Sequence, residues 1–473
     1  MKTMIFRLMC GFATFALCGA TTAVGADTPA GFETPAMPAN PPATWLTYHL
    51  AHPGVVPIPG DPDCAFFWKG RYHLHYIHTQ NGFNFAHVSS TDMVHWKWHP
   101  TTLIPRFTGH GMFSGTGFFT KEGKPAIIYA GEGTYRNWMA FAMDDNLEQW
   151  TKPEPLKIKE PNGEESKLRQ VDPDCWLNGD TYYAISAGRG AHIMKSSDLK
   201  EWLHLGPLMH DDMPATLGVS KDEDVSCANM FRIGNKWMLL CISHDLGCRY
   251  YLGSFKDEKF LPEFHAMMNW HAWEFFAPES VLTKDGRRVM WAWCKIDNAE
   301  TQSDIQSLPR ELSLPEDGVL RIKPLRELES LRYDGNSVSA ISIKSDSSRM
   351  LDGIAGDTLE LNVTFQPTTA KEYGVNVFCD AKGAGFPITV KPESQKLVMG
   401  NSEAPFEVKP SEVLNLRIFL DKGMVEVFAN DRQSVVSMQP HKPEDVGVGM
   451  FSKGADVEVK NIKSWKMQSI YQK

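Results

Sequence analysis

Short apolar strands and glycine turns alternate through most of the chain. Five segments share one order: a small or acidic residue, a short strand, a turn glycine, and a second strand rich in apolar and aromatic residues. The turn glycines are 53, 56, 55 and 52 residues apart. Glycine suits these turns because a tight hairpin requires a positive φ. The five are Gly70, Gly123, Gly179, Gly234 and Gly286.

A second pattern repeats in phase with the first. Tryptophans follow an Asp-containing turn at Trp96, Trp150 and Trp202, at intervals of 54 and 52 residues. Long helical periodicity is scarce between residues 46 and 310. Four-stranded sheets repeated around an axis account for both periods, so we predict an all-β fold with a five-bladed β-propeller at residues 46–325. The alternative is an irregular β-sandwich with chance spacing.

The pattern changes near residue 334. About nine short strands with polar turns follow, which predicts a C-terminal β-sandwich at residues 326–473. The stretch 310–332 between the two regions resembles a linker. At the other end, residues 27–45 are rich in Pro, Ala and Thr and predict an extended N-terminal arm.

Residues 1–26 have the pattern of a signal peptide. Lys2 and Arg7 precede an apolar run from Leu8 to about Ala20, and small residues end at Ala26. The run is shorter than the ~20 apolar residues of a membrane span. We therefore expect a secreted protein, periplasmic or extracellular, released rather than lipid-anchored because Cys18 lacks the residues typical before a lipidated cysteine.

Composition narrows the choice of partners. The formal charge of −9 becomes −11 once Lys2 and Arg7 are removed, and no basic stripe is present. Nucleic acid and anionic membrane surfaces are therefore unsuitable partners. Aromatic residues make up 11% of the chain, with 14 tryptophans, which suits both a β-rich core and the binding of sugar rings. The oligomeric state stays open.

The cysteines indicate neither zinc nor a disulfide framework. Seven remain after residue 26, with no CxxC pair. One disulfide, such as Cys241 with Cys248, is an open alternative to small buried thiols.

Carboxylates recur in phase with the blades. Asp61 and Asp172 both open an Asp-Pro-Asp-Cys run, nine and seven residues before their turn glycines. An acidic cluster stands near the corresponding place in the fourth blade: Asp222, Glu223 and Asp224. Because the first strand of each blade lines the axis, these groups should meet at one mouth of the channel. Crowded carboxylates repel, which raises the pKa of at least one and prepares it as a general acid. Glycosidic cleavage needs one ionised and one protonated carboxyl group. Solvated turn caps are the alternative.

Several segments together resemble glycoside hydrolase family 32, which contains invertases, levanases and inulinases. They cover the mature chain from about residue 46 and include FAHVSSTDMVHWKWHPTTLIP (85–105), GHGMFSGTGFF (109–119), FAPESVLTKDGRRVMWAW (276–293) and LRIFLDKGMVEVFAND (416–431). The resemblance implies a propeller followed by a sandwich and hydrolysis of fructosides.

The catalytic motifs depart from the family pattern. The resemblance implies that Asp61 is the nucleophile and that Asp172 grips sugar hydroxyls. The family's acid/base Glu aligns with Ser226, so this chain lacks the expected Glu at that position. A shift of two residues along a strand keeps the same face. We therefore expect Asp224 to supply the acid, with Glu223 as its rival if a bulge re-aims the strand and Glu279 as a third choice. By the same reasoning Arg169 replaces the family's sugar-gripping arginine.

Other residues are expected in substrate binding. Phe113 and Ser114 match a sugar-contacting segment of the family, and Trp273 is placed to stack on a sugar. The remaining candidates are His78, His110 and His244. Because these histidines lack ligand spacing, we expect no catalytic metal and no cofactor.

The expected function is retaining hydrolysis of furanosides in an oligo- or polysaccharide, foremost β-fructosides. Two alternatives stay open: hydrolysis of another glycoside such as an arabinofuranoside on the same scaffold, and a non-catalytic carbohydrate-binding relative.

Overall fold

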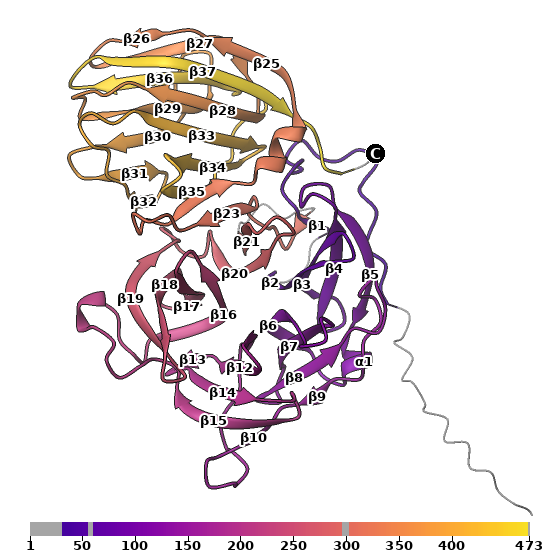
Figure 1. The fold of residues 1–473 in the computed structure, drawn as a ribbon. Coiled ribbons are helices and arrows are strands. Elements are labelled where there is room, and N and C mark those ends of the chain that lie inside the picture. Colours follow the sequence, from indigo (N-terminus) through magenta and orange to yellow (C-terminus); the bar gives the residue numbers. More distant parts are fainter. Residues whose placement is uncertain (1–30, 55–59, 296–301, 472–473) are drawn as a thin grey trace, which may run out of the picture.

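The computed structural model describes residues 31–54, 60–295 and 302–471, so the predicted signal peptide lies outside the described residues. Five antiparallel four-stranded sheets surround an axis, and a two-sheet sandwich follows, which confirms the predicted fold class (Figure 1). The third and fourth sheets each gain one short extra strand. No helix in the described part is long and apolar enough to cross a membrane.

The blade strands run outward from the axis in chain order. The first blade has β2 (Pro62–Trp68), β3 (Arg71–Thr79), β4 (Phe83–Ser90) and β5 (Lys97–Leu103), and the second has β6 (Met112–Phe119), β7 (Pro125–Gly131), β8 (Arg136–Phe141) and β9 (Glu154–Pro155). The third has β11 (Asp174–Asn178), β12 (Thr181–Ser186), β14 (His192–Ser196) and β15 (Glu201–Pro207), with β10 (Lys157–Lys159) on its edge. The fourth has β16 (Asp224–Ile233), β17 (Lys236–Ser243), β18 (Gly247–Lys256) and β19 (Lys259–Met267), with β13 (Gly188–Arg189) beside β16, and the fifth has β20 (Phe276–Leu282), β21 (Arg288–Trp293), β23 (Arg310–Ser313) and β24 (Arg321–Pro324). Between blades lie the short helices α1 (Pro105–Thr108) and η1 (Ala215–Leu217).

The predicted repeat corresponds to one hairpin per blade. All five turn glycines have positive φ, from 55° to 83°, and join the first two strands of their blades. Trp150 and Trp202 are fully buried and pack between adjacent blades. The hydrophobic core therefore lies mainly between neighbouring sheets, which is why the sequence period is that of a blade.

The stretch 310–332, which resembled a linker, is folded. It supplies β23 and β24, the two outer strands of the fifth blade, and then the 3₁₀ helix η2 (Arg326–Leu331). The linker interpretation was wrong because the apolar residues Leu312, Leu320 and Ile322 are buried in the propeller core.

The C-terminal unit is a sandwich of a seven-stranded and a six-stranded sheet around an aliphatic core. The first sheet contains β25 (Arg332–Val338), β26 (Ile341–Ile343), β28 (Thr358–Phe365), β33 (Leu414–Asp421), β34 (Met424–Ala429), β35 (Gln433–Met438) and β37 (Val457–Met467); the second contains β27 (Ser347–Ala355), β29 (Glu372–Cys379), β30 (Phe386–Lys391), β31 (Lys396–Met399), β32 (Ser402–Pro405) and β36 (Gly447–Lys453).

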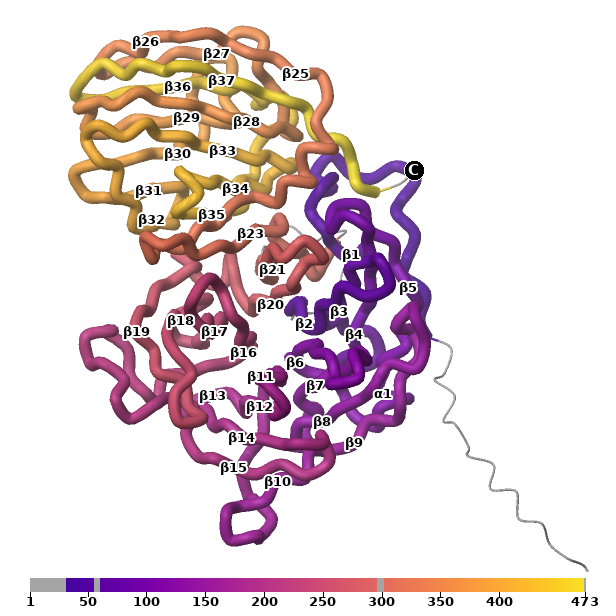
Figure 2. The backbone as a smooth tube through the Cα atoms, in the orientation of Figure 1, coloured from indigo at the N-terminus to yellow at the C-terminus, as the bar shows by residue number. Residues whose placement is uncertain are grey.

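A buried charged network joins the two units. Figure 2 shows the C-terminal segment running back beside the segment near residue 47, where Ile470 donates its N–H to the Thr47 carbonyl. Next to it, Nδ1 of His49 lies 2.8 Å from Asp421 and Nε2 lies 3.3 Å from Glu426. Glu426 also accepts from Arg310 at 2.6 Å. Nearby, β1 (His52–Pro53) pairs with β22 (Gln302–Ser303).

Candidate active site

A cavity of about 910 Å³ opens at one end of the propeller axis, where the inner strands begin. Each blade contributes at least one residue at or near the start of its inner strand to the lining. Among them are Asp61, Ser114, Asp172, Cys227 and Phe276. The predicted meeting of the inner strands at one mouth is therefore seen in the structure, and Asp61, Phe113, Ser114, Arg169, Asp172, Asp224, His244 and Trp273 all line this cavity.

Irregular backbone shapes this mouth. In the second blade, the inner strand β6 shifts register against β7 between Phe113 and Gly115. In the fourth blade, the inner strand β16 shifts register against β17 between Ser226 and Asn229. Asp172 and Cys227 hold left-handed conformations, with φ of 37° and 47°. Bulges and left-handed residues re-aim side chains that a regular strand would direct along the sheet, and they are common at functional sites.

Asp61, the predicted nucleophile, is buried at the cavity floor. Its Oδ2 accepts a hydrogen bond of 3.1 Å from Ser114 Oγ and lies 3.8 Å from the Cys227 thiol, while its buried Oδ1 has no partner among the described residues. Burial raises the pKa of Asp61, and the charge of Asp172 raises it further, whereas the hydrogen bond from Ser114 lowers it. The pKa of Asp61 is about 7. The ionised form of this carboxylate is the one that can attack as a nucleophile.

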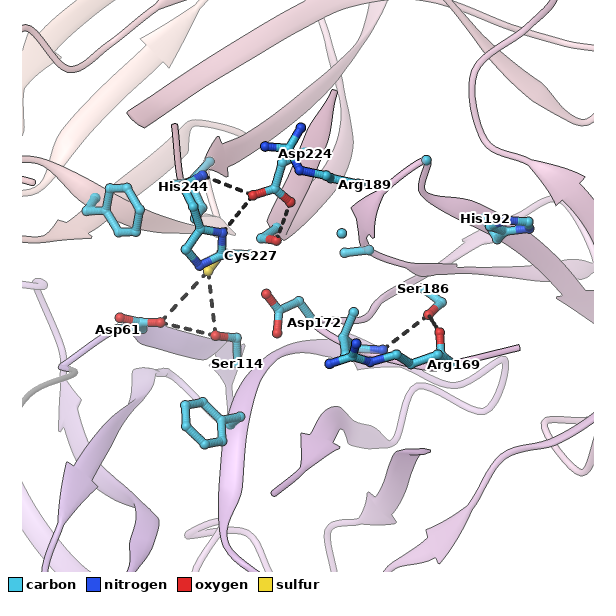
Figure 3. Close-up of a pocket in the computed structure, with 18 of the residues that line it drawn as sticks. Asp61, Ser114, Arg169, Asp172, Ser186, Arg189, His192, Asp224, Cys227 and His244 are labelled. Carbon is cyan, nitrogen blue, oxygen red and sulfur yellow. Dashed lines mark hydrogen bonds and ion pairs between the residues drawn. The ribbon is translucent and has the colours of Figure 1, made fainter. Parts of the chain in front are cut away.

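Asp172 faces Asp61 across the cavity (Figure 3). Burial raises the pKa of Asp172, the charge of His244 and a hydrogen bond from the Cys227 backbone N–H oppose that rise, and the charge of Asp224 adds to it. The two aspartates come from blades one and three, so only closure of the propeller brings them together.

Asp224, the predicted proton donor, lies at the start of β16 with both oxygens hydrogen-bonded. Oδ1 accepts from Ser226 Oγ at 2.7 Å; Oδ2 accepts from the His244 N–H at 2.9 Å and lies 2.6 Å from Nδ1 of that ring. Burial alone would raise the pKa of Asp224, but the bonds from His244 and Ser226 outweigh it and lower the pKa to about 2. An ionised, fully bonded carboxylate holds no proton to give, so this geometry argues against Asp224 as the acid.

The two other candidate acids do not line the cavity. Glu223 accepts hydrogen bonds from Ser243 Oγ at 2.8 Å and from the Asp224 N–H at 3.0 Å. Glu279 lies further along the channel, 2% exposed, where burial and then the charges of Asp174 and Asp63 raise its pKa well above the usual range. The bulge in β16 follows Ser226 and so does not re-aim Glu223 toward the cavity.

Two of the three candidate histidines also lie elsewhere. Nδ1 of His78 is 2.7 Å from Asp304, and its ring stacks on His52. Nε2 of His110 is 3.1 Å from the Tyr129 hydroxyl, and its ring packs against Trp138. His78 and His110 are therefore not among the residues that line the cavity, because both rings are held by partners outside that lining, and their role in substrate binding stays a prediction.

Aromatic rings form the walls. Trp273 stacks on Phe276 with centroids 4.5 Å apart and planes at 15°, and Phe113 packs on Phe83 with centroids 4.5 Å apart. Such flat apolar faces bind the C–H side of sugar rings. Phe276 was missed from the sequence, although its place at the start of the fifth inner strand is in phase with the other site residues.

Two arginines lie at the rim. Arg169 is exposed and its guanidinium lies 4.7 Å from the centroid of the Tyr135 ring. Within the described residues, Arg169 forms no ion pair with Asp172. Arg189, which pairs with Asp245, was not foreseen because it follows a glycine outside the repeated strands.

One group among the described residues brings three possible metal donors within 4.8 Å of one another: His52, His78 and Asp304. The two rings stack with centroids 3.8 Å apart and planes at 28°. Stacked rings do not direct their nitrogens at one point, so the group fits a hydrogen-bonded stack better than a metal centre. All seven cysteines of the described part are free thiols, and Cys241 and Cys248 form no disulfide.

Comparison with known proteins agrees with this architecture. The profile for the glycosyl hydrolases family 32 N-terminal domain matches residues 58–324, and the profile for the family's C-terminal region matches residues 327–466. A sucrose-6-phosphate hydrolase of Zymomonas mobilis is 24% identical over 438 residues, covering 81% of this chain and 85% of its own. A levanase of Bacillus subtilis is 26% identical over 480 residues, covering 87% of this chain and 69% of its own.

Solved structures agree in fold. Fructan 1-exohydrolase IIa from Cichorium intybus superposes with a TM-score of 0.74 at 18% identity, covering 90% of this chain and 98% of its own. Sucrose-6-phosphate hydrolase from Lactobacillus gasseri gives 0.71 at 19% identity, covering 90% and 94%. The two profiles together span nearly all of the propeller and sandwich, and the chain therefore belongs to glycosyl hydrolase family 32 and is a glycoside hydrolase.

Proposed function

We propose that this chain is an exported hydrolase that releases β-linked fructosyl units from oligo- or polysaccharides with retention of configuration. The observation that carries the proposal is the pairing of Asp61 and Asp172 at the floor of an aromatic-walled cavity. The names of its relatives include sucrose-6-phosphate hydrolase, raffinose invertase and levanase. These names share fructosyl-containing substrates, which supports this sugar class.

In the proposed mechanism, a carboxylate oxygen of Asp61 attacks the anomeric carbon as the bond to the leaving oxygen breaks. A proton donor on the fourth blade protonates that oxygen. Water then attacks the anomeric carbon, its proton returns to the same residue, and the sugar leaves Asp61. Asp172 accepts hydrogen bonds from ring hydroxyls, and these bonds strengthen as the ring flattens toward the transition state. Trp273 and Phe113 orient the sugar.

Export rests on the sequence of residues 1–26. A positive start, an apolar run and a small-residue end support a cleaved signal peptide and a periplasmic or extracellular enzyme. Cell fractionation and the N-terminal sequence of the mature protein test this. A mature chain that begins at residue 1 in the cytoplasm contradicts it.

A second candidate is hydrolysis of another furanoside, such as an arabinofuranoside. It is favoured by Ser226 at the position where the family resemblance expects an acidic residue. The test is sugar release by the mature protein from sucrose, inulin, levan, arabinan and aryl furanosides, with Asp61→Asn alongside. Fructose release that is lost in the variant supports the first candidate, arabinose release supports the second, and silence from folded protein favours a carbohydrate-binding role.

A further inference from the structure

The position expected for the catalytic acid holds Ser226, and the nearest carboxylate on the same strand face is already occupied. Ser226 donates its hydroxyl to Asp224 Oδ1 at 2.7 Å, which shows that residues two apart share a face here. Asp224 is 7% exposed at its side chain and is bonded through both oxygens. The fourth blade therefore needs another group that can hold a proton within reach of the glycosidic oxygen.

His244 has the required position. It directly follows β17, and pairing of β17 with β16 sets Ile242 opposite Ser226, so His244 arrives beside Asp224. Its side chain is 58% exposed and lines the cavity, whereas the carboxylate behind it is shielded. Figure 3 shows the ring between Asp224 and the pair of Asp61 and Cys227.

The ring is held in one orientation. Nδ1 lies 2.6 Å from Asp224 Oδ2, which leaves Nε2 for the cavity. The rings of Trp273 and Phe276 contact it edge-on, at centroid distances of 6.3 and 6.2 Å. A carboxylate behind one nitrogen fixes the tautomer and presents the other nitrogen to the reaction, as in other His–Asp pairs of hydrolases.

We propose that His244, oriented by Asp224, replaces the missing carboxylic acid as the proton donor and acceptor of this hydrolase. The proposal rests on the proposed function and names a residue for its acid/base step. Asp224 is then a positioning residue, because it acts on substrate only through the ring.

His244 gives up one proton in the first step of the reaction and regains one in the second. In the first step Nε2–H gives its proton to the glycosidic oxygen as the C–O bond breaks and Asp61 forms an ester with the sugar. The departing alcohol is neutral, and His244 becomes a neutral imidazole. In the second step that imidazole takes a proton from the attacking water, the ester bond to Asp61 breaks, and His244 is again protonated.

The groups around His244 favour the protonated form of its ring before the first step of the reaction. The hydrogen bond to Asp224 raises the pKa of His244, partial burial opposes this, and the charges of Asp224, Asp172 and Asp61 raise it further. The other groups near the ring are the Cys227 thiol, whose pKa burial raises well above its usual value, and the Arg189–Asp245 pair at the rim. These contacts favour the protonated imidazole over the neutral one.

The test uses the full mature chain and compares two leaving groups. His244→Gln removes the proton, and a furanoside of an acidic phenol needs little protonation to depart. We expect His244→Gln to lower kcat/KM on the sugar substrate by about 100- to 10,000-fold and on the aryl furanoside by much less. Azide, which attacks the Asp61 ester without base assistance, should restore turnover of the aryl substrate and yield a glycosyl azide.

Two further variants separate chemistry from folding. Asp224→Asn should move the basic limb of the pH–rate profile to lower pH, because the pKa of His244 falls without the carboxylate. His95→Gln is the matched control: this ring also has Nδ1 2.8 Å from an aspartate, Asp92, but on an exposed turn of the first blade, and its rates should equal those of the wild type.

The outcomes separate the two proposals. Wild-type activity that persists in His244→Gln on both substrates, with an unchanged basic limb, overturns the dyad and leaves the hydrolase function intact. Loss of activity in Glu223→Gln with azide rescue would instead assign the acid to that residue. An inactive wild type across every furanoside overturns the proposed function and the dyad with it.

Discussion

Ser114 Oγ donates a hydrogen bond of 3.1 Å to Oδ2 of Asp61, linking the inner strand of the second blade to the candidate nucleophile of the first. This bond stabilises the ionised carboxylate against burial and against the charge of Asp172, so that the pKa of Asp61 is about 7.

Removing this donor should raise the pKa of Asp61. A hydrogen bond to a charged group is worth about 1.5–3 kcal/mol, so Ser114→Ala should move the acidic limb of kcat/KM up by roughly one pH unit or more. The loss should be greatest below pH 7 and should disappear only where the pH exceeds the raised pKa, as measured by a pH–rate profile. An acidic limb that does not move would show that Asp61 does not set it.

Asp172→Asn should shift the same limb in the opposite direction. The negative charge of Asp172 raises the pKa of Asp61, so a neutral amide lets Asp61 ionise at lower pH. Turnover should nevertheless fall by about 100-fold or more, because an electrostatic contact that strengthens in the transition state is lost. Full pH profiles of kcat and kcat/KM distinguish the two effects. A slow variant whose acidic limb keeps its position contradicts the coupling.

Trp273→Ala should weaken binding more than chemistry. The ring forms one wall of the cavity and stacks on Phe276 at 4.5 Å, so we expect KM to rise by roughly tenfold, with a smaller fall in kcat. Trp273→Phe keeps a flat face and should retain most of the affinity. The prediction fails if Trp273→Ala leaves KM unchanged while kcat collapses, which would place Trp273 at the reacting atoms.

The contact between propeller and sandwich should weaken in alkaline solution. Burial alone would lower the pKa of His49, but its bonds to Asp421 and Glu426 raise it to about 9. A raised folded-state pKa means that this stabilisation is complete below about pH 6.5 and is lost as pH rises through about 9. The linked contribution is on the order of 3 kcal/mol.

Urea unfolding of the wild type and of His49→Gln at pH 6 and pH 9 measures the stabilisation that comes from the raised pKa of His49. The free energy of unfolding of the wild type should fall from pH 6 to pH 9. The variant should be less stable than the wild type at pH 6, and its free energy of unfolding should be nearly the same at both pH values. The His95→Gln control should follow the wild type, because His95 and Asp92 lie on an exposed turn. A wild type equally stable at both pH values contradicts the prediction.

Local features of the sequence determined the fold and two site residues. Strand alternation, turn glycines and packing tryptophans are short-range signals, and their common period of about 54 residues defines a blade. Asp61 and Asp172 were found because they recur in phase with that period. Phe113 and Ser114 were located by resemblance of a short segment and Trp273 by its place before the fifth blade, and all three line the cavity.

The remaining site depended on tertiary structure. His244 lies 20 residues after Asp224, and only the register of β16 and β17 pairs them. The geometry argues against Asp224 as the acid because of hydrogen bonds that come from that register. His78 and His110 are bound to partners that no local pattern reveals.

The sequence by itself determined the repeated strands, the propeller and sandwich, and the two aspartates in phase with the blades, because these follow from local periodicity and turn chemistry. Only the tertiary structure decided which side chains share the cavity and which titratable groups hold a proton. Burial and hydrogen bonding between distant strands control both properties.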